Sequence, residues 1–209
     1  RKNDGFLNII SIFSFIGISL GVAVLIIVMS VMNGFRTELI NKIVGFNAHV
    51  TVKPYEHKID IEKINNKNLD LISENVILSN SAEAIIINNN TSKGIVLRGY
   101  SVQDFSKIKI IQNKTFIGDR NNLMKNSISI GKELSFILDV KIGDSITLMS
   151  SSGVETIIGN LPKQKTFKIS SLFESGLVDF DTNIAFINLG TLEEFINLDP
   201  QKRNLEIYL

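Results

Sequence analysis

The dominant feature of the hydropathy pattern is a run of 31 residues, Gly5 to Phe35, that contains no charged side chain. At about 1.5 Å of rise per residue this run forms a helix about 46 Å long, whereas roughly 20 apolar residues already cross a hydrocarbon core of about 30 Å. The pattern therefore predicts one membrane-spanning helix whose outer end projects beyond the bilayer. The remaining sequence mixes polar and apolar residues as a folded extramembrane domain does.

The helix is expected to be retained and to continue past the uncharged run. A cleaved signal peptide has an apolar stretch of only about 7–15 residues, which is much shorter. Helical spacing continues from Arg36 to Gly45, where the glycine can end the helix. Basic residues flank both ends, so the orientation depends on the rule that long domains translocate regardless of charge. We expect a cytoplasmic stub at 1–5, a transmembrane helix at 6–45 and a periplasmic domain at 46–209.

The pattern after the helix predicts alternating strands and short helices. Strands are expected at residues 49–53, 76–88, 94–100, 127–130, 145–149, 166–173 and 183–188. Short helices are expected at residues 59–72 and 131–138, and a last helix begins at the capping-box pattern Thr191-Leu-Glu-Glu194 and buries Leu192, Phe195 and Ile196. This order, without repeats or a long linker, predicts an α+β domain.

One segment of the domain, Ser150 to Gln164, is predicted to be a loop because it is rich in Gly and Ser and lacks a regular pattern. Fifteen residues are long for a hairpin connection, and long loops are usually functional or disordered. Its partly apolar tip contains Ile157, Ile158, Leu161 and Pro162, and this favours contact with another molecule. Because the sequence starts at Arg1 without Met and stops inside an alternating segment, we expect a fragment of a longer protein.

Composition excludes several function classes. The net charge is +1 and no basic run exceeds two residues, which argues against a nucleic-acid footprint. The absence of Cys excludes a disulfide framework and cysteine catalysis. No G-x-S-x-G element and no Gly-rich nucleotide loop ending in Lys-Ser/Thr occurs, so no hydrolase or ATPase site is visible.

Two groups of side chains are candidate metal ligands. His49 and His57 flank a proline without metal-ligand spacing, so we interpret them as surface or turn residues. Glu174, Asp179 and Asp181 form an acidic cluster that lacks the alternating ligands and glycine of a calcium loop. A solvated turn is the better interpretation of this cluster, and no metal site is predicted.

The membrane helix has one distinctive face. At about 100° per residue, six positions share a stripe about 80° wide: Gly17, Gly21, Leu25, Val28, Met32 and Phe35. Gly17 and Gly21 match the small-xxx-small pattern through which membrane helices approach closely. The alternative is that glycines occur there by chance and that the stripe packs within its own protein. Met32 and Phe35 lie past the depth that spanning requires, which favours a contact surface there.

Several motifs together resemble one known family. The segments Gly17-Ile-Ser-Leu-Gly-Val22 and Ser30-Val-Met-Asn-Gly-Phe35 are similar to the first transmembrane helix of the lipoprotein-releasing permeases LolC and LolE. Val-Met-Asn-Gly-Phe is the specific element, whereas the Gly-Asp turn is shared with MacB-like and FtsX-like permeases. The resemblance continues through four further segments, which are residues 97–104, 128–134, 143–146 and 173–181.

This resemblance implies a four-helix permease with a MacB-like periplasmic core after its first helix. It implies a second LolC/LolE-type permease subunit and two copies of a LolD-like ATPase as partners. Such complexes pass outer-membrane lipoproteins from the inner membrane to the periplasmic chaperone LolA. The family carries a protruding hook loop that holds the chaperone, and residues 150–164, including Lys163, look like its counterpart. Thr156 to Gly159 lacks the first proline of the LolC-like hook, whereas Pro162 retains the second.

The main hypothesis is therefore a non-catalytic transport subunit of the bacterial inner membrane. Leu25, Val28, Met32 and Phe35 are expected to contact the acyl chains of the lipoprotein, since exposing each methylene costs about 0.8 kcal/mol. No cofactor is expected on this chain, because ATP and Mg²⁺ would bind the partner ATPase. The alternatives are a MacB-like efflux permease, an FtsX-like regulator and, from a different class, a membrane-anchored sensor or adhesion domain.

Overall fold

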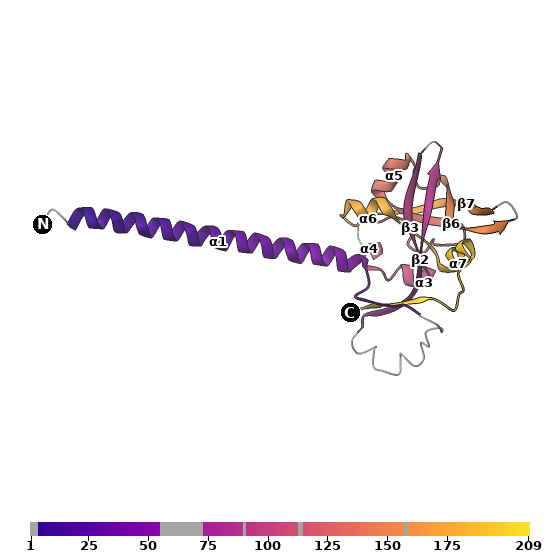
Figure 1. The fold of residues 1–209 in the computed structure, drawn as a ribbon, viewed down its shortest axis with the longest axis horizontal. Coiled ribbons are helices and arrows are strands. Elements are labelled where there is room, and N and C mark those ends of the chain that lie inside the picture. The colour runs from indigo at the N-terminus through magenta and orange to yellow at the C-terminus, as the bar shows by residue number, and fades with distance from the viewer. Residues whose placement is uncertain (1–3, 55–72, 90, 113–114, 157–158) are drawn as a thin grey trace. The chain divides into compact units, whose positions relative to one another are not determined.

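The computed structural model describes residues 4–54, 73–89, 91–112, 115–156 and 159–209 (Figure 1). The chain divides into two compact units, residues 1–43 and 44–209. The first is formed by the long helix α1, Asp4–Phe46. Its segment Gly5–Ile40 is long and apolar enough to cross a membrane, and none of it is buried. The predicted long helix is therefore present.

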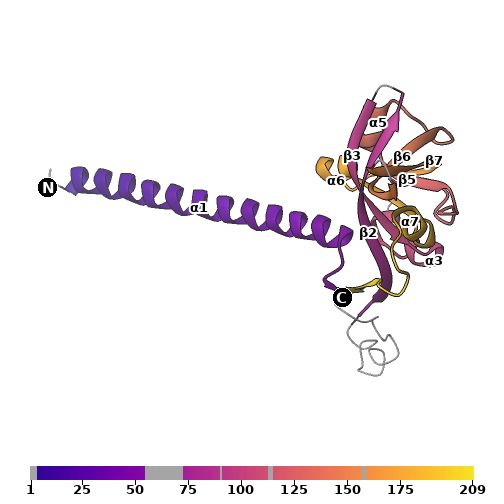
Figure 2. The same cartoon turned by 45° about the vertical axis from the view of Figure 1, so that its right-hand side comes forward.

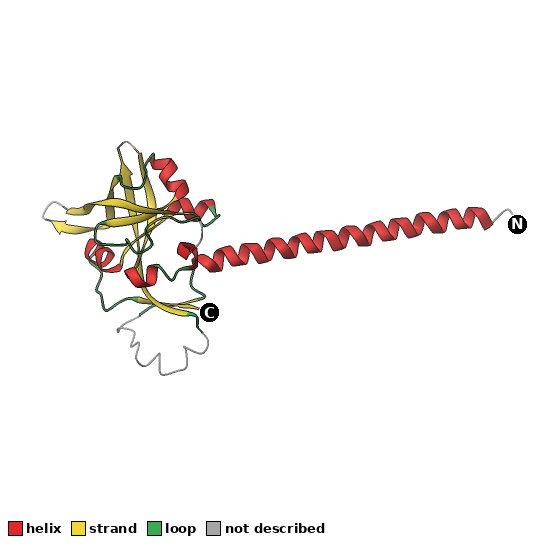
Figure 3. Ribbon diagram, turned by 180° about the vertical axis from the view of Figure 1, so that it is seen from behind, coloured by secondary structure: helices red, strands yellow, loops and turns green. Residues whose placement is uncertain are grey.

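The second unit is built from strands with short helices between them (Figure 3). Its strands are β1 Val50–Val52, β2 Asn75–Asn88, β3 Thr91–Tyr100, β4 Ile117–Gly118, β5 Ser127–Gly131, β6 Ser145–Thr156, β7 Gly159–Phe173, β8 Ile184–Asn188 and β9 Asn204–Tyr208. Its helices are α3 Val102–Phe105, α4 Lys109–Gln112, α5 Lys132–Leu138, α6 Val178–Asn183 and α7 Leu189–Ile196.

Most predicted elements are confirmed. Each of the seven predicted strands coincides with an observed strand, and α5 and α7 match predicted helices. The helix predicted at 59–72 lies outside the described residues. The sequence pattern missed three helices of four to six residues, because helices this short show hardly one turn of periodicity, and it missed β4, which has only two residues. The alternation at the end of the chain was noted but no strand was assigned to it, and β9 lies there.

Six strands in the described part of the domain form a closed ring. The hydrogen-bonded order is β2-β3-β8-β5-β7-β6, and β6 pairs back onto β2. The β3–β8 and β5–β7 pairs are parallel and the others are antiparallel. Figure 2 shows the strands of this ring turned by 45° from the first view. Closure removes the exposed edges that an open sheet would leave.

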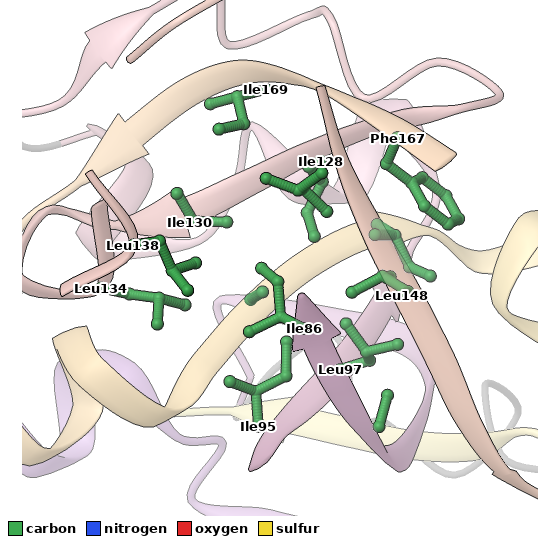
Figure 4. Packing of buried hydrophobic residues seen from close by; sticks show 14 of the residues in the cluster. Ile86, Ile95, Leu97, Ile128, Ile130, Leu134, Leu138, Leu148, Phe167 and Ile169 are labelled. Atoms are coloured by element: carbon green, nitrogen blue, oxygen red, sulfur yellow. The ribbon is translucent and has the colours of Figure 1, made fainter. Parts of the chain in front are cut away.

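The main hydrophobic core lies on one face of every strand in the ring. Each strand contributes two buried residues at alternate positions, as in Ile86 with Ala84 and Ile130 with Ile128. Helix α5 adds Leu134 and Leu138, and α7 adds Leu192 and Phe195. Figure 4 shows side chains from these strands and from α5 converging. The ring and the two helices therefore share one core, and they are expected to fold as one unit.

A second, aromatic core lies on the other side of β3 and β8. Phe186 is at its centre, with ring centroids 4.9 Å from Phe173, 5.5 Å from Phe105 and 5.9 Å from Tyr100. Ile108 and Ile111, from the region of α3 and α4, complete this cluster. The short helices that the sequence pattern missed are thus held in place by tertiary contacts and not by intrinsic helix stability.

The N-cap of α7 differs from the predicted one. Strand β8 runs directly into the helix, and the side chain of Asn188 accepts hydrogen bonds from the backbone N–H groups of Gly190 and Thr191. The predicted capping box at Thr191 is therefore wrong by one turn, because the strand end places Asn188 at the cap. Leu192 and Phe195 are buried as predicted, and Ile196 is partly buried.

Gly131 marks the closest approach of two segments of the domain. A Cβ atom added there would lie 2.0 Å from the backbone oxygen of Asp181 in α6. The glycine therefore lets α6 pack directly on the end of β5, which the sequence alone does not reveal. Gly94, in β3, offers a contrast because a Cβ atom added there would meet no atom within 4 Å.

We predict that Gly131→Ala lowers the free energy of unfolding by about 3 kcal/mol, because backbone atoms of Asp181 cannot move aside as a side chain could. Thermal unfolding followed by circular dichroism would measure this change. The matched control is Gly94→Ala, which should stay within about 1 kcal/mol of the unmodified protein. Equal stabilities of the two variants would contradict the close approach of α6 and β5.

Candidate functional site

The segment predicted as an irregular loop, Ser150 to Gln164, is instead a β-hairpin. Strands β6 and β7 pair from Ser145 with Lys168 to Thr156 with Gly159, with a register shift between Met149 and Gly153. The prediction was wrong because Gly and Ser are poor strand formers, yet pairing depends on backbone groups that every residue except proline supplies. The register shift accommodates the extra residues of the Ser-rich stretch.

The outer half of this hairpin has no further strand partner among the described residues. Strand β2 pairs with β6 only from Thr147 to Ser150, and β5 pairs with β7 only from Lys168 onward. Figure 1 shows β6 and β7 continuing past the remainder of the sheet. Gly153 allows the two strands to approach each other closely, since a Cβ atom there would lie 2.7 Å from the backbone oxygen of Leu161. We call residues 151–163 the projecting hairpin.

The predicted docking residues fall in different parts of the projecting hairpin. Ile157 and Ile158 lie outside the described residues. Leu161 is 53% exposed, and Pro162 is exposed opposite Gly153, where a missing N–H is tolerated because no strand lies beyond it. An exposed leucine beside a conformationally restricted proline can contact a partner with little loss of entropy.

Lys163 has a structural contact that the sequence did not suggest. Its Nζ donates hydrogen bonds to the backbone oxygen of Glu194, at 3.1 Å, and to the side-chain oxygen of Asn197. Asn197 is the left-handed C-cap of α7, so the ammonium binds the negative end of that helix. Lys163 therefore ties the base of the projecting hairpin to α7.

The stripe on α1 is exposed along its whole length. Leu25, Val28, Met32 and Phe35 are each between 54 and 62% exposed. Gly17 and Gly21 have no atom within 4 Å of the position that a Cβ atom would take, leaving room for another helix. Lipid contact and helix packing by these residues stay predictions.

The carboxylate of Glu206 in β9 is buried, with the residue 5% exposed. It accepts hydrogen bonds from the hydroxyl groups of Ser79, Tyr100 and Tyr208 and from the guanidinium of Arg98, over 2.7 to 3.1 Å. The charge is thus both paired and hydrogen-bonded, as a buried carboxylate requires. We call these five residues the Glu206 cluster.

The Glu206 cluster lies where the chain enters the domain. Arg98 also donates to the side-chain oxygen of Asn47 at 3.1 Å, and Asn47 directly follows the last residue of α1. Strand β1 pairs with β9, and the backbone N–H of Leu209 donates to Nδ1 of His49. This contact agrees with a structural role for His49, whereas His57 lies outside the described residues. The first and last described segments of the domain are therefore held to β2 and β3 by one charge network.

Burial sets the protonation of this cluster. Burial raises the pKa of the Tyr100 hydroxyl well above its usual range, and the Glu206 carboxylate adds to the rise although the Arg98 charge opposes it. Burial and Glu206 raise the pKa of Tyr208 in the same direction. Both hydroxyl groups hence remain protonated near neutral pH and can keep donating to Glu206.

The acidic cluster near α6 is only partly the solvated turn that was predicted. Asp179 is exposed, but Asp181 is 2% exposed and accepts a hydrogen bond from the backbone N–H of Ser175. Burial raises the pKa of the Asp181 carboxyl, although hydrogen bonds from Ser175 lower it. Glu174 pairs with Lys132 at 3.1 Å. Among the described residues no group of three His, Cys, Asp or Glu side chains could hold a metal ion.

The sequence pattern did not predict that Arg98 and Glu206 form a pair. The available signal was that each sits in an alternating segment, Leu97-Arg-Gly-Tyr100 and Leu205-Glu-Ile-Tyr208. In both strands a charged residue lies two positions before a tyrosine and so on the same face of the strand, which could have suggested a buried pair. Only the pairing of β2 with both β3 and β9 brings the two residues together.

Comparison with known proteins identifies similar chains over most of this sequence. A family model described as the MacB-like periplasmic core domain matches residues 11–209. The chain is 26% identical over 208 residues to the "Lipoprotein-releasing system transmembrane protein LolC" of Xylella fastidiosa (strain Temecula1 / ATCC 700964), covering 95% of this chain and 49% of that protein. It is 28% identical over 214 residues to LolE of Haemophilus influenzae, covering 97% and 50%.

The chain thus spans about half the length of these curated relatives. A solved structure, the periplasmic region of MacB from Actinobacillus actinomycetemcomitans, aligns with a TM-score of 0.43 and 11% identity, covering 76% of this chain and 66% of that one. The resemblance to LolC and LolE that the motifs indicated is confirmed, as is the α+β class with a MacB-like core.

We predict that Arg98→Met lowers the free energy of unfolding by about 3–5 kcal/mol, since it leaves the Glu206 carboxylate buried without a positive charge. Urea unfolding of the detergent-solubilised protein would measure the loss. The control is Lys109→Met, which removes the exposed ion pair with Glu74 and should cost less than about 1 kcal/mol. If Arg98→Met cost no more than its control, the Glu206 cluster would not depend on charge pairing.

Proposed function

Because the chain belongs to the family of the MacB-like periplasmic core domain, we propose that it is a permease subunit of an ABC transporter that releases lipoproteins from the bacterial inner membrane. The observation that carries this proposal is the similarity to LolC and LolE, which extends over 95% or more of the chain and includes α1. In this proposal the domain that follows α1 is periplasmic, and the lipoprotein passes to a LolA-like chaperone.

The proposed lipid-contact surface is the stripe of Leu25, Val28, Met32 and Phe35. Lifting an acylated protein exposes methylene groups, each of which costs about 0.8 kcal/mol in water. An exposed apolar stripe on a helix longer than the bilayer would cover those groups during the transfer. Met32 suits this role because its unbranched side chain adapts to chains of different shape.

Gly17 and Gly21 are proposed to pack against another membrane helix. Their open surroundings leave room for a second backbone, and close packing replaces the hydrophobic drive that lipid does not provide. A second LolC/LolE-type permease subunit would supply helices for such packing. ATP hydrolysis, with ATP and Mg²⁺, is assigned to a LolD-like ATPase, which makes this chain a non-catalytic subunit.

The projecting hairpin is proposed to dock the chaperone through Leu161 and Pro162, together with Ile157 and Ile158, which lie outside the described residues. Paired strands hold this segment in one shape, so less conformational entropy is lost on binding than an irregular loop would lose. Lys163 is proposed to hold the base of the hairpin, since its ammonium donates hydrogen bonds to the C-terminal end of α7. The proposed docking surface therefore does not include the ammonium of Lys163.

The alternative functions differ in the parts of the protein beyond this chain. A MacB-like efflux permease would carry a nucleotide-binding domain on the same polypeptide, and a sensor or adhesion protein would need no further membrane helices. The matched relatives are named as lipoprotein-releasing proteins, which favours the main proposal over both alternatives and over an FtsX-like regulator.

We predict that a photoreactive amino acid at Met32 crosslinks to lipoprotein, and that crosslinking decreases when ATP hydrolysis releases the cargo. Ile26 is the matched control, because it is equally exposed, at 60%, but lies about 120° away around the helix. The measurement is immunoblotting for lipoprotein after irradiation of membranes. Equal crosslinking from Ile26 and Met32 would reject the stripe as a lipid-contact surface.

We predict that shortening the projecting hairpin abolishes chaperone binding without unfolding the domain. Replacing residues 154–162 with Asn-Gly-Thr closes the hairpin after Gly153, supplies opposite it the backbone N–H that Pro162 lacks, and leaves the inner pairs intact. Leu161→Asp alone should weaken binding about tenfold. Val178→Asp, at an equally exposed apolar residue of α6, is the control and should bind normally.

The readout is capture of purified LolA-like chaperone by the intact transporter, with circular dichroism as the test of folding. A folded, shortened variant that still captures the chaperone would show that the hairpin is not the docking arm. Loss of folding would be revealed by the spectrum, and Leu161→Asp then decides the question because its side chain lies at the surface.

A further inference from the structure

The described part of the domain carries an unusual apolar surface on the side of α5 and β4. Two adjoining hollows, of about 450 and 530 Å³, share Ile142 in their linings. Large apolar side chains line them and are well exposed: Ile117 at 52%, Met124 at 62%, Phe136 at 67% and Ile142 at 41%. Single exposed apolar residues are ordinary, but a continuous group of this size indicates a binding surface.

The charges around this surface have one predominant sign. Lys132 and Lys141 line the first hollow, and Lys125 and Lys168 line the second, whereas Asp139 is the one acidic residue in either lining. Lys132 and Lys125 have acidic partners, Glu174 and Glu194. Neither Lys141 nor Lys168 has an acidic partner among the residues that the structure describes. The surface is therefore apolar with an excess of positive charge.

We propose that this surface docks the domain on an anionic lipid surface, with the apolar side chains at the level of the headgroups and the lysines on the phosphates. Lysine stems can lie along apolar groups while their ammonium groups reach the anionic layer. Basic residues beside exposed aromatic and aliphatic residues are the pattern by which proteins bind membrane interfaces. Lys141 and Phe136 line the same hollow, so a charged and an apolar group for this interaction lie together there.

A lipid surface is favoured over a protein partner by the tether. The domain begins at Val44, directly after the unit that contains the candidate membrane span, with no linker between them. Attachment to this helix keeps the domain near the same bilayer permanently, so docking needs no diffusional encounter and weak individual contacts suffice. The proposal does not depend on which cargo the transporter carries, and so it stands or falls separately from the proposed function.

The test uses the full-length protein in nanodiscs of phosphatidylcholine, with and without phosphatidylglycerol. Because the chain contains no Cys, a fluorophore can be placed at single cysteines substituted for Ile137, Ser92 or Leu25. Ile137 is exposed in α5 beside Phe136, Ser92 is exposed on β3 and Leu25 reports insertion of α1. Nitroxide-labelled lipid then quenches only those fluorophores that reach the bilayer.

We expect quenching at position 25 in every nanodisc and at position 137 in those that contain phosphatidylglycerol, with none at position 92. Lys141→Gln and Lys168→Gln should each lower the ratio of docked to undocked domain about fivefold, and added salt should do the same. Phe136→Ser should also reduce docking in nanodiscs that contain phosphatidylglycerol, but without changing its dependence on salt. Unchanged circular dichroism would establish that these exposed substitutions leave the domain folded.

Three results would overturn the proposal. Quenching at position 137 no stronger than at position 92, with position 25 fully quenched, would show that this surface does not reach the lipid. Protection of position 137 from an aqueous quencher without any quenching by lipid would mean that another protein covers the surface. Quenching that ignores both phosphatidylglycerol and the lysine substitutions would equally reject the anionic-lipid assignment.

Discussion

One edge of strand β2 pairs with two different strands, and the architecture of the domain depends on this constraint. The first residues of β2 pair with β9 and residues 84–87 pair with β6, while its other edge pairs with β3 from Ser79 to Asn88. The pairing with β6 closes the six-stranded ring around the aliphatic core. The pairing with β9 brings the last described strand next to β1, where the chain enters the domain.

The division of the β2 edge between β9 and β6 also explains why the Arg98 and Glu206 charges are buried at one place. Where β9 pairs with β2, the aromatic core adjoins the segment by which the chain enters the domain. Glu206 and Arg98 are hydrogen-bonded there. A buried ion pair adds little net stability compared with apolar residues, but it is costly to break on one side only. Its value is specificity, because the five polar groups of the Glu206 cluster can be satisfied together in only one register of β2, β3 and β9.

The functional surfaces proposed for this protein lie outside both cores. The α1 stripe and the projecting hairpin expose apolar groups that the fold does not need to bury, and so does the lysine-rimmed surface at α5. Each is supported by a rigid element: a continuous helix, a paired hairpin or the end of the closed ring. Function of this kind requires no pocket with reactive groups, since apolar contact and charge complementarity act over open surfaces.

The sequence by itself determined the elements with strong local signals. The uncharged run from Gly5 to Phe35 and the alternating segments of β2, β3, β5 and β8 were predicted correctly, because hydrophobic periodicity and length are local properties. The motifs around Gly17 and Phe35 also sufficed to identify the family. Tertiary structure alone decided the remaining features, whose stabilising partners are distant in the chain. The hairpin at Ser150 to Gln164 is formed by backbone pairing that the side-chain pattern does not predict. Helix α3 packs on Phe186 through Phe105, and α4 joins the same core through Ile110 and Ile111. The Arg98 and Glu206 pair, 108 residues apart, exists only because β2 brings β3 and β9 together.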